Sequence, residues 1–187
     1  KFLYKDREYE INVEGDYNIE NSLAAINLGY KLGMEYDEIH RGLAAYKPIE
    51  KRWEILDAGG YKVINDSYNA NPESMKAAVS TFLQHYKHPV VVLGDMGELG
   101  ENEQELHAMV GEHFEGKGID ALFAAGALSE NLAQAVRKCS KETEVHYFKT
   151  KDELMEELLP YVKSGDTVLV KASHFMGFPE VVGQLTK

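Results

Sequence analysis

Residues 90–94 read Val-Val-Val-Leu-Gly, and this short apolar run decides the fold class. A strand buried on both faces reads as a continuous apolar segment, whereas a half-exposed strand alternates. Further strands are predicted at 120–125, 144–148 and 166–171, separated by helical patterns of about 10–15 residues. This alternation predicts a Rossmann-like α/β fold, with a mostly parallel sheet and helices on both faces. The predicted helices cover residues 72–86, 102–115, 128–138, 151–163 and 178–186.

A hairpin is predicted immediately before this alternation. Two strand patterns, at residues 52–57 and 61–66, flank Ala58-Gly59-Gly60. Paired glycines readily adopt the positive φ values of a tight turn. We therefore expect one antiparallel strand pair at an edge of the parallel sheet.

The first 47 residues are organised differently. Alternating apolar and polar residues predict a strand or hairpin within 1–14, and helical patterns follow at 18–33 and 36–46. These two helices have no sheet of their own to cover. We therefore expect residues 1–47 to be a small α+β end of another domain, and residues 48–187 to form a complete α/β domain.

The composition excludes several classes of protein. Twenty basic and 31 acidic residues give a net charge of −11, which argues against a nucleic-acid partner. No apolar run reaches the roughly 18 residues that a membrane span needs. The single cysteine, Cys139, cannot form an internal disulfide, which fits a reducing compartment. The sequence contains no CxxC, HExxH or GxxxxGK[ST] motif, and so neither a strong metal signature nor a P-loop.

The functional site is expected beyond the carboxyl ends of the parallel strands, where open α/β sheets bind their ligands. This rule selects four polar loops that are too elaborate to be mere turns. They lie at 65–72 (Asn-Asp-Ser-Tyr-Asn-Ala-Asn-Pro), 94–100 (Gly-Asp-Met-Gly-Glu-Leu-Gly), 126–129 and 171–177.

Two of these loops contain residues with specific chemistry. Asn71 and Pro72 are typical of a helix N-cap and first helical residue. Asp66 has two interpretations, because a carboxylate at a strand end can accept hydrogen bonds from ribose hydroxyls or stabilise a local turn. The adjacent Ser173 and His174 do not predict serine catalysis. Neighbours at a strand end rarely face each other, and no G-x-S-x-G elbow is present.

Four stretches resemble motifs of the Mur ligase family. Residues 15–25 resemble G-x-H-N-x-x-N-x-L-A-A at the end of the family's central ATPase domain, and residues 51–54 resemble the G-R-x-E that opens its C-terminal domain. Residues 65–78 resemble D-D-S-Y-N-A-N-P-x-S-M-x-A-A, and residues 93–100 resemble L-G-D-M-x-E-L-G. The resemblance covers essentially the whole chain. The Tyr-Asn-Ala-Asn-Pro run selects the branch that adds D-alanyl-D-alanine.

The resemblance implies a function and a domain assignment. It makes 1–47 the end of the central ATP-binding domain and 48–187 the C-terminal domain of a monomeric, cytoplasmic bacterial enzyme. That enzyme uses ATP and Mg²⁺ to join D-alanyl-D-alanine to UDP-MurNAc-tripeptide through an acyl phosphate, in peptidoglycan precursor synthesis. The P-loop and the Mg²⁺ ligands would lie in a preceding part of the central domain. No catalytic residue or metal ligand is assigned here, and the chain alone is expected to be inactive.

The resemblance also implies roles for individual residues. On the nucleotide side, Asn18 would face the adenine, Arg52 the ATP phosphates and Asp66 the ribose. On the acceptor side, Tyr68, Asn69 and Asn71 would shape the cleft near the incoming dipeptide, and Ser173 would help to place its carboxylate.

The chain departs from the family pattern at five positions. Tyr17 replaces a histidine, Lys51 a glycine and Asn65 an aspartate. Ala172 and His174 replace the glycine and arginine of the last motif, K-G-S-R, and weaken the carboxylate-side assignment most. Two alternatives therefore stay open. One is a sister ligase that adds another amino acid, as in folyl-polyglutamate or cyanophycin synthesis, and the other is a non-catalytic α/β binding module.

Overall fold

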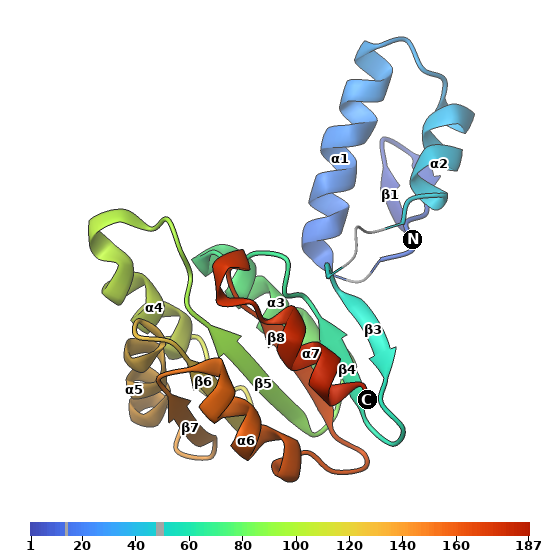
Figure 1. Ribbon diagram of the computed structural model, residues 1–187. Coiled ribbons are helices and arrows are strands. Elements are labelled where there is room, and N and C mark those ends of the chain that lie inside the picture. Colours follow the sequence, from blue (N-terminus) through green and yellow to red (C-terminus); the bar gives the residue numbers. More distant parts are fainter. Residues whose placement is uncertain (14, 48–50) are drawn as a thin grey trace. The chain divides into compact units, whose positions relative to one another are not determined.

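The computed structural model describes residues 1–13, 15–47 and 51–187, which fall into two compact units (Figure 1). The first unit contains the described residues up to 47, and the second contains those from 51 onward. The domain boundary expected between residues 47 and 48 involves residues outside the described ranges. None of the helices in those ranges combines the length and the hydropathy that a bilayer crossing requires.

The first unit is a hairpin with two helices. Its elements are β1 (Phe2–Tyr4), β2 (Arg7–Tyr9), α1 (Asp16–Lys31) and α2 (Tyr36–Ala44), with β1 and β2 antiparallel. Tyr9, Ile26 and Ile39 form its small buried core. Gly33 follows the end of α1 with a φ of 82°, the left-handed conformation with which glycine commonly stops a helix.

The second unit contains a six-stranded sheet. Its strands are β3 (Glu54–Asp57), β4 (Lys62–Asn65), β5 (Pro89–Gly94), β6 (Ala121–Ala125), β7 (Glu144–Phe148) and β8 (Thr167–Lys171). They lie in the order β3-β4-β8-β5-β6-β7, and only the β3–β4 hairpin is antiparallel. The predicted mostly parallel sheet with an antiparallel edge hairpin is therefore confirmed.

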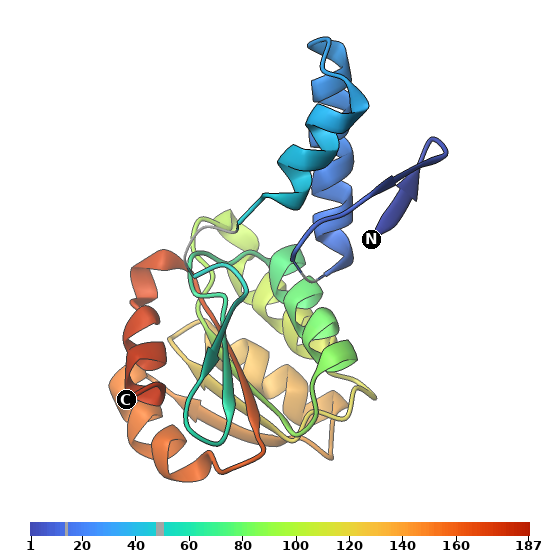
Figure 2. The same cartoon turned by 90° about the vertical axis from the view of Figure 1, so that its right-hand side faces the viewer.

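Helices cover both faces of this sheet (Figure 2). One face packs against α3 (Pro72–His85), α4 (Glu103–Glu112) and α5 (Ser129–Cys139), and the other against α6 (Lys151–Tyr161) and α7 (Pro179–Leu185). Two short 3₁₀ helices are not predicted by the sequence. η1 (Gly100–Asn102) spans the end of the 94–100 loop and the first residue of the helix predicted at 102–115, and η2 (His174–Met176) lies in the 171–177 loop.

Alternation along the strands distributes the core between the two faces. In β5, Val91 and Leu93 face the α3–α5 layer, whereas Val90 and Val92 face the α6–α7 layer. All four side chains are buried, which explains why this strand is apolar at every position.

The strand predicted at 52–57 begins two residues later than expected. Lys51 and Trp53 have φ values of 65° and 52°, outside the extended region that a strand requires. The Trp53 side chain is buried in the core on the α3–α5 side. The chain therefore turns into β3 at a residue whose side chain packs in the core.

Candidate functional site

A buried ion pair joins the first and last loops at the carboxyl edge of the sheet. Asp66 follows β4 and Lys171 ends β8. Each lies two residues beyond a core residue on the α3–α5 face, Ile64 and Leu169 respectively. Lys171 Nζ lies 2.6 Å from Asp66 Oδ2, and the two side chains are only 5% and 13% exposed. The same ammonium group donates to the Asn69 carbonyl over 3.0 Å.

The second oxygen of Asp66 binds a more distant part of the chain rather than its own turn. Asp66 Oδ1 accepts a hydrogen bond from the Trp53 backbone N–H over 3.2 Å. The local turn is formed by Asn65, whose Oδ1 accepts from the Ser67 hydroxyl over 2.6 Å. Asn65 Nδ2 also donates to Glu54 Oε2. The structure therefore gives the turn-stabilising role to Asn65 and leaves Asp66 in a long-range contact.

Ser173 connects three of the four loops. Its Oγ accepts from the Gly97 N–H over 2.9 Å and donates to the Ala70 carbonyl over 3.2 Å, while its own N–H donates to the Asp95 carbonyl. Ser173 is buried, whereas the adjacent His174 is exposed. The two side chains therefore point to different environments, as expected for neighbours at a strand end.

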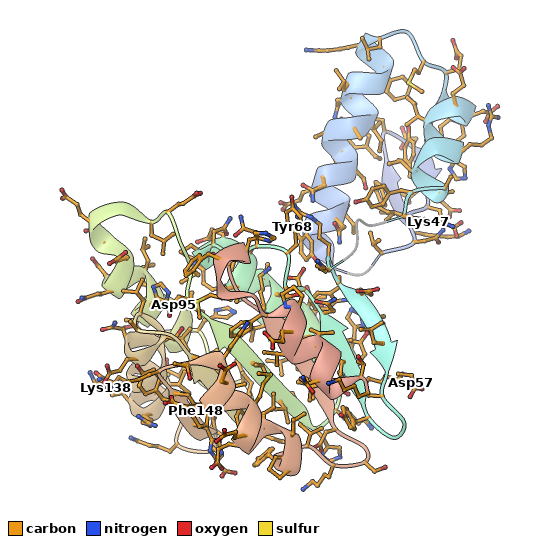
Figure 3. The ribbon with its side chains drawn as sticks, viewed as in Figure 1. Lys47, Asp57, Tyr68, Asp95, Lys138 and Phe148 are labelled. Atoms are coloured by element: carbon orange, nitrogen blue, oxygen red, sulfur yellow. The ribbon has the colours of Figure 1, made fainter. Side chains whose placement is uncertain are left out.

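Asp95 connects the second loop to the third. Its Oδ1 accepts from both the N–H and the hydroxyl of Ser129, and its Oδ2 accepts from the Leu128 N–H. Gly126 makes this approach possible, because a Cβ atom there would overlap with the Asp95 carboxyl group. Figure 3 labels Asp95 beside the sheet edge. The sequence places Asp95 in a candidate loop but assigns no role to it.

His107, on α4, fixes the middle of the 94–100 loop. Its Nε2 accepts from the Met96 N–H over 2.9 Å, and its Nδ1 faces the Glu103 carbonyl at 2.6 Å. Because an amide N–H can only donate, Nε2 carries no proton and Nδ1 carries the single one. Sequence reasoning missed this residue. The available signal was its place three residues before the buried Val110, on the apolar side of the helix.

An exposed rim surrounds the buried contacts. The Arg52 guanidinium carbon lies 4.1 Å from the centre of the Tyr68 ring, which is a cation–π geometry. The His174 ring lies 6.4 Å from the same ring, and Tyr68 remains 41% exposed (labelled in Figure 3). Asn69 is exposed as well, with its side-chain oxygen accepting from the Ala70 N–H. The rim thus carries a permanent positive charge in a chain of net charge −11.

The remaining predicted residues have structural roles of their own. Asn71 is the N-cap of α3 as expected, with its side chain accepting from the Ser74 N–H over 2.8 Å and Pro72 in the first turn. Asn18 belongs to the first unit, where its carbonyl accepts from the Ser22 hydroxyl within α1. The structure therefore brings the predicted residues of the second unit, Arg52, Asp66, Tyr68, Asn69, Asn71 and Ser173, to the loops at one edge of its sheet.

Across residues 1–13, 15–47 and 51–187, no group of three or more histidine, cysteine, aspartate or glutamate side chains is placed to bind a metal ion. Asp66 offers carboxylate oxygens that can accept hydrogen bonds from hydroxyl groups, and the exposed Arg52 guanidinium offers donors for anionic oxygens.

Comparisons of the sequence with known proteins give matches that cover most of the chain. Residues 51–174 match the model of a family described as "Mur ligase, glutamate ligase domain". The UDP-N-acetylmuramoyl-tripeptide–D-alanyl-D-alanine ligase of Bacillus subtilis (strain 168) is 33% identical over 96% of this chain and 40% of its own length. The corresponding ligase of Escherichia coli (strain K12) is 36% identical over 91% of this chain and 37% of its own length.

Solved structures of similar fold include MurF ligases. A crystal structure of MurF from Acinetobacter baumannii superimposes with a TM-score of 0.83 at 26% identity, over 95% of this chain and 39% of that one. The structure of MurF ligase from Thermotoga maritima in complex with ADP superimposes with a TM-score of 0.73 at 27% identity, over 92% of this chain and 38% of that one. The chain spans about two fifths of the length of these relatives. Because the family match covers more than half of the chain, the chain belongs to the Mur ligase family.

Proposed function

We propose that this chain is part of an ATP-dependent ligase that adds D-alanyl-D-alanine to UDP-MurNAc-tripeptide in peptidoglycan precursor synthesis. One observation carries the proposal: the 65–72 loop, which resembles the signature of this branch, lies at the carboxyl edge of the sheet with Asp66 held in place and Arg52 exposed. Relatives with that printed activity match nearly the whole chain. The described residues would form the end of the central domain, up to 47, and the C-terminal domain, from 51.

The nucleotide would bind through three residues. A carboxylate has about four acceptor positions, and Asp66 uses two of them for Lys171 and Trp53. The others are available for the two ribose hydroxyls. The Arg52 guanidinium would bind phosphate oxygens, for which its planar array of donors is suited. Asn18 on α1 would face the adenine.

The acceptor side would be formed by the rim and by the loops beneath it. Tyr68 and Asn69 are exposed and would border the cleft for the incoming dipeptide. The side chains of Asn71 and Ser173 are hydrogen-bonded within the protein. They would therefore shape this cleft by fixing the loops, with Ser173 placing the backbone near the dipeptide carboxylate.

The reaction would proceed in two displacements. The tripeptide carboxylate attacks the γ-phosphate of ATP, which gives an acyl phosphate and ADP. The dipeptide amine then attacks the acyl carbon, loses a proton and expels phosphate. Mg²⁺ would neutralise phosphate charge during the first displacement, held by residues of the central domain beyond this chain. The second unit would orient the ribose and the dipeptide, and would exclude water on domain closure.

The test is a ligation assay with the full-length ligase that contains this chain. ATP, UDP-MurNAc-tripeptide and D-alanyl-D-alanine should yield ADP and the pentapeptide product, detected by mass spectrometry. L-glutamate and L-alanyl-L-alanine serve as control acceptors, and preference for another amino acid would indicate a sister ligase instead. A chain that binds neither nucleotide nor acceptor would support the non-catalytic module. The 187-residue chain alone should be inactive, and robust ligation by it would contradict the proposed division of the site.

Asp66 can be tested within the same assay. Asp66→Ala should raise the KM for ATP, because the ribose loses its acceptor. Asp57→Ala is the matched control, since Asp57 ends β3 and lies away from the carboxyl edge (Figure 3). A normal KM for ATP in Asp66→Ala would remove the ribose assignment.

A further inference from the structure

The buried ion pair at the carboxyl edge is more than packing requires. Lys171 ends β8, the strand that lies between β4 and β5, and its side chain is 5% exposed. Burying two charged groups costs hydration that their ion pair replaces only in part, so a pair of apolar side chains of similar volume is often at least as stable. An ion pair at this position therefore points to a requirement of the site rather than of the fold.

We propose that Lys171 is a positioning residue for nucleotide binding. Its ammonium group would hold the Asp66 carboxylate, and the turn that follows it, in the geometry that receives the ribose hydroxyls, without itself contacting the nucleotide. This inference rests on the proposed function, because it assigns to Asp66 the ribose contact described above.

The geometry of the ammonium group supports this role. Nζ has three hydrogens, and it donates to Asp66 Oδ2 over 2.6 Å and to the Asn69 carbonyl over 3.0 Å. These acceptors lie at the two ends of a four-residue segment, so one cation fixes both the carboxylate and the backbone path behind it. The Trp53 N–H holds the other carboxylate oxygen. Asp66 therefore cannot rotate without breaking a contact on one side or the other.

The charge of Lys171 supports the same role. The chain carries a net charge of −11, and an uncompensated carboxylate beside a triphosphate would repel it. The Lys171 ammonium offsets the charge of Asp66 while leaving part of its acceptor capacity for neutral hydroxyls. Arg52, which is exposed, then stays available for the phosphates themselves.

The experiment compares Lys171→Met, Lys171→Arg, Asp66→Ala and the double variant Lys171→Met/Asp66→Ala in the full-length ligase. Lys171→Met should raise the KM for ATP by about tenfold or more, because it breaks a buried charge pair. The KM for D-alanyl-D-alanine should change by less than the KM for ATP, because Lys171 ion-pairs with Asp66 but contacts Asn69 only at its backbone carbonyl. Lys171→Arg should restore part of the ATP affinity, because it keeps the charge. Lys62→Met, at the start of β4 and exposed, is the control that should leave both constants unchanged.

The double variant decides how Lys171 acts. If Lys171 works through Asp66, adding Lys171→Met to Asp66→Ala should change the KM for ATP by less than about twofold. This comparison stays valid if Lys171→Met alone fails to fold, because the double variant buries no unpaired charge. Full additivity would mean that Lys171 contacts the nucleotide itself and would overturn the proposal.

Two further results have separate meanings. A folded Lys171→Met with an unchanged KM for ATP, or with both KM values raised equally, would also overturn the positioning role. Absence of ligation by the unsubstituted enzyme would instead refute the proposed function. Calorimetric titration with ATP, which needs no turnover, would still report whether Lys171 and Asp66 act together in binding.

Discussion

The backbone N–H and the hydroxyl of Ser129 both donate hydrogen bonds to the same oxygen of Asp95, each over 2.7 Å. Asp95 follows β5 and Ser129 begins α5, so this contact holds the second and third loops of the site together. It also places a carboxylate at the N-terminal end of a helix, where the helix dipole favours negative charge. Both residues are buried, and their contact therefore belongs to the buried part of the site, beneath the exposed rim.

Removing this carboxylate should destabilise the second unit strongly. Asp95→Ala leaves three donors on Leu128 and Ser129 without their acceptor, and we expect a loss of about 2–4 kcal/mol in the free energy of unfolding. Ser129→Ala removes only one of the three bonds and should cost about 1 kcal/mol. Urea denaturation followed by circular dichroism measures both. Equal losses for the two variants would show that the carboxylate is not the centre of this network.

His107 should hold the 94–100 loop through a neutral imidazole. His107→Ala removes the partner of the Met96 N–H, so hydrogen exchange at that amide should accelerate and stability should fall by about 2–3 kcal/mol. Nitrogen NMR should find the proton of His107 on Nδ1. The exposed His85→Ala is the control and should change stability by less than about 0.5 kcal/mol. A proton on Nε2 would contradict the hydrogen-bond assignment.

Two helical glycines should respond to alanine in opposite directions. A Cβ atom at Gly111 would overlap with the Leu132 carbonyl oxygen, so α4 and α5 must separate, and we expect Gly111→Ala to cost about 2 kcal/mol. Apart from its chain neighbours and the adjacent backbone of its own helix, a Cβ atom at Gly183, in α7, would meet no atom of the described residues within 4 Å, so Gly183→Ala should stabilise by about 0.5–1 kcal/mol. Thermal melting of the two variants distinguishes close packing from helix propensity. A neutral Gly111→Ala would show that the two helices can move apart freely.

Tyr161 should make the free energy of unfolding depend on pH in the alkaline range. Burial, together with its hydrogen bond to Glu144, raises the pKa of the Tyr161 phenol to about 12. The unfolded phenol ionises near 10, so the folded state keeps a proton that the unfolded state loses. This contribution is complete below about pH 10 and is lost as the pH rises through 12. Tyr161→Phe should therefore flatten the fall in unfolding free energy over that interval, as followed by urea titrations.

Glu144→Gln tests how much the charge of Glu144 contributes to the raised pKa of Tyr161. The amide keeps an acceptor for the Tyr161 hydroxyl but removes the negative charge, so the pKa of the phenol should move part of the way back toward its ordinary value. Ultraviolet difference spectroscopy of phenolate formation reports it directly. An unchanged titration would show that the negative charge of Glu144 does not contribute to the raised pKa.

Arg52 should not be replaceable by lysine. Its guanidinium packs on the Tyr68 ring, an arrangement that uses the flat, delocalised cation. Arg52→Lys keeps the charge but loses paired donors to phosphate, so the KM for ATP should rise several-fold in the full-length ligase. Arg137→Lys, an exposed substitution on α5, is the control. Equal KM values for the Arg52 variant and the unsubstituted enzyme would show that the phosphates lie elsewhere.

Much of the second unit could be predicted because its sequence is locally consistent. Continuous apolar runs such as Val90–Leu93 can be buried only in a sheet covered on both faces, and Asn71-Pro72 has the chemistry of a helix start at its true position. The strand predicted at 144–148 has the bounds that the structure shows. The strand predicted before Ala58 is too long. Lys51 and Trp53 have positive φ values, which the pattern of apolar residues cannot reveal.

The contacts that make the site were harder to predict, because they join distant residues. The strand-end position of Asp66 singles it out, but its partner Lys171 lies 105 residues away and depends on β8 entering the sheet beside β4. Periodicity gives the type of an element but not the order of strands. Asp95 and His107 escaped assignment for the same reason, since most of their partners are backbone groups, which have no signature in the sequence.

The order of the strands also has a consequence for biosynthesis. β8 is the last strand that the ribosome makes in this sheet, yet it lies in the interior between β4 and β5. Until residues 167–171 emerge, those two strands have no partner on their facing edges and expose apolar segments that favour association between nascent chains. The ion pair of Lys171 with Asp66 forms only after that insertion. The nucleotide-facing loop would therefore mature late, as one of the final events in making this domain.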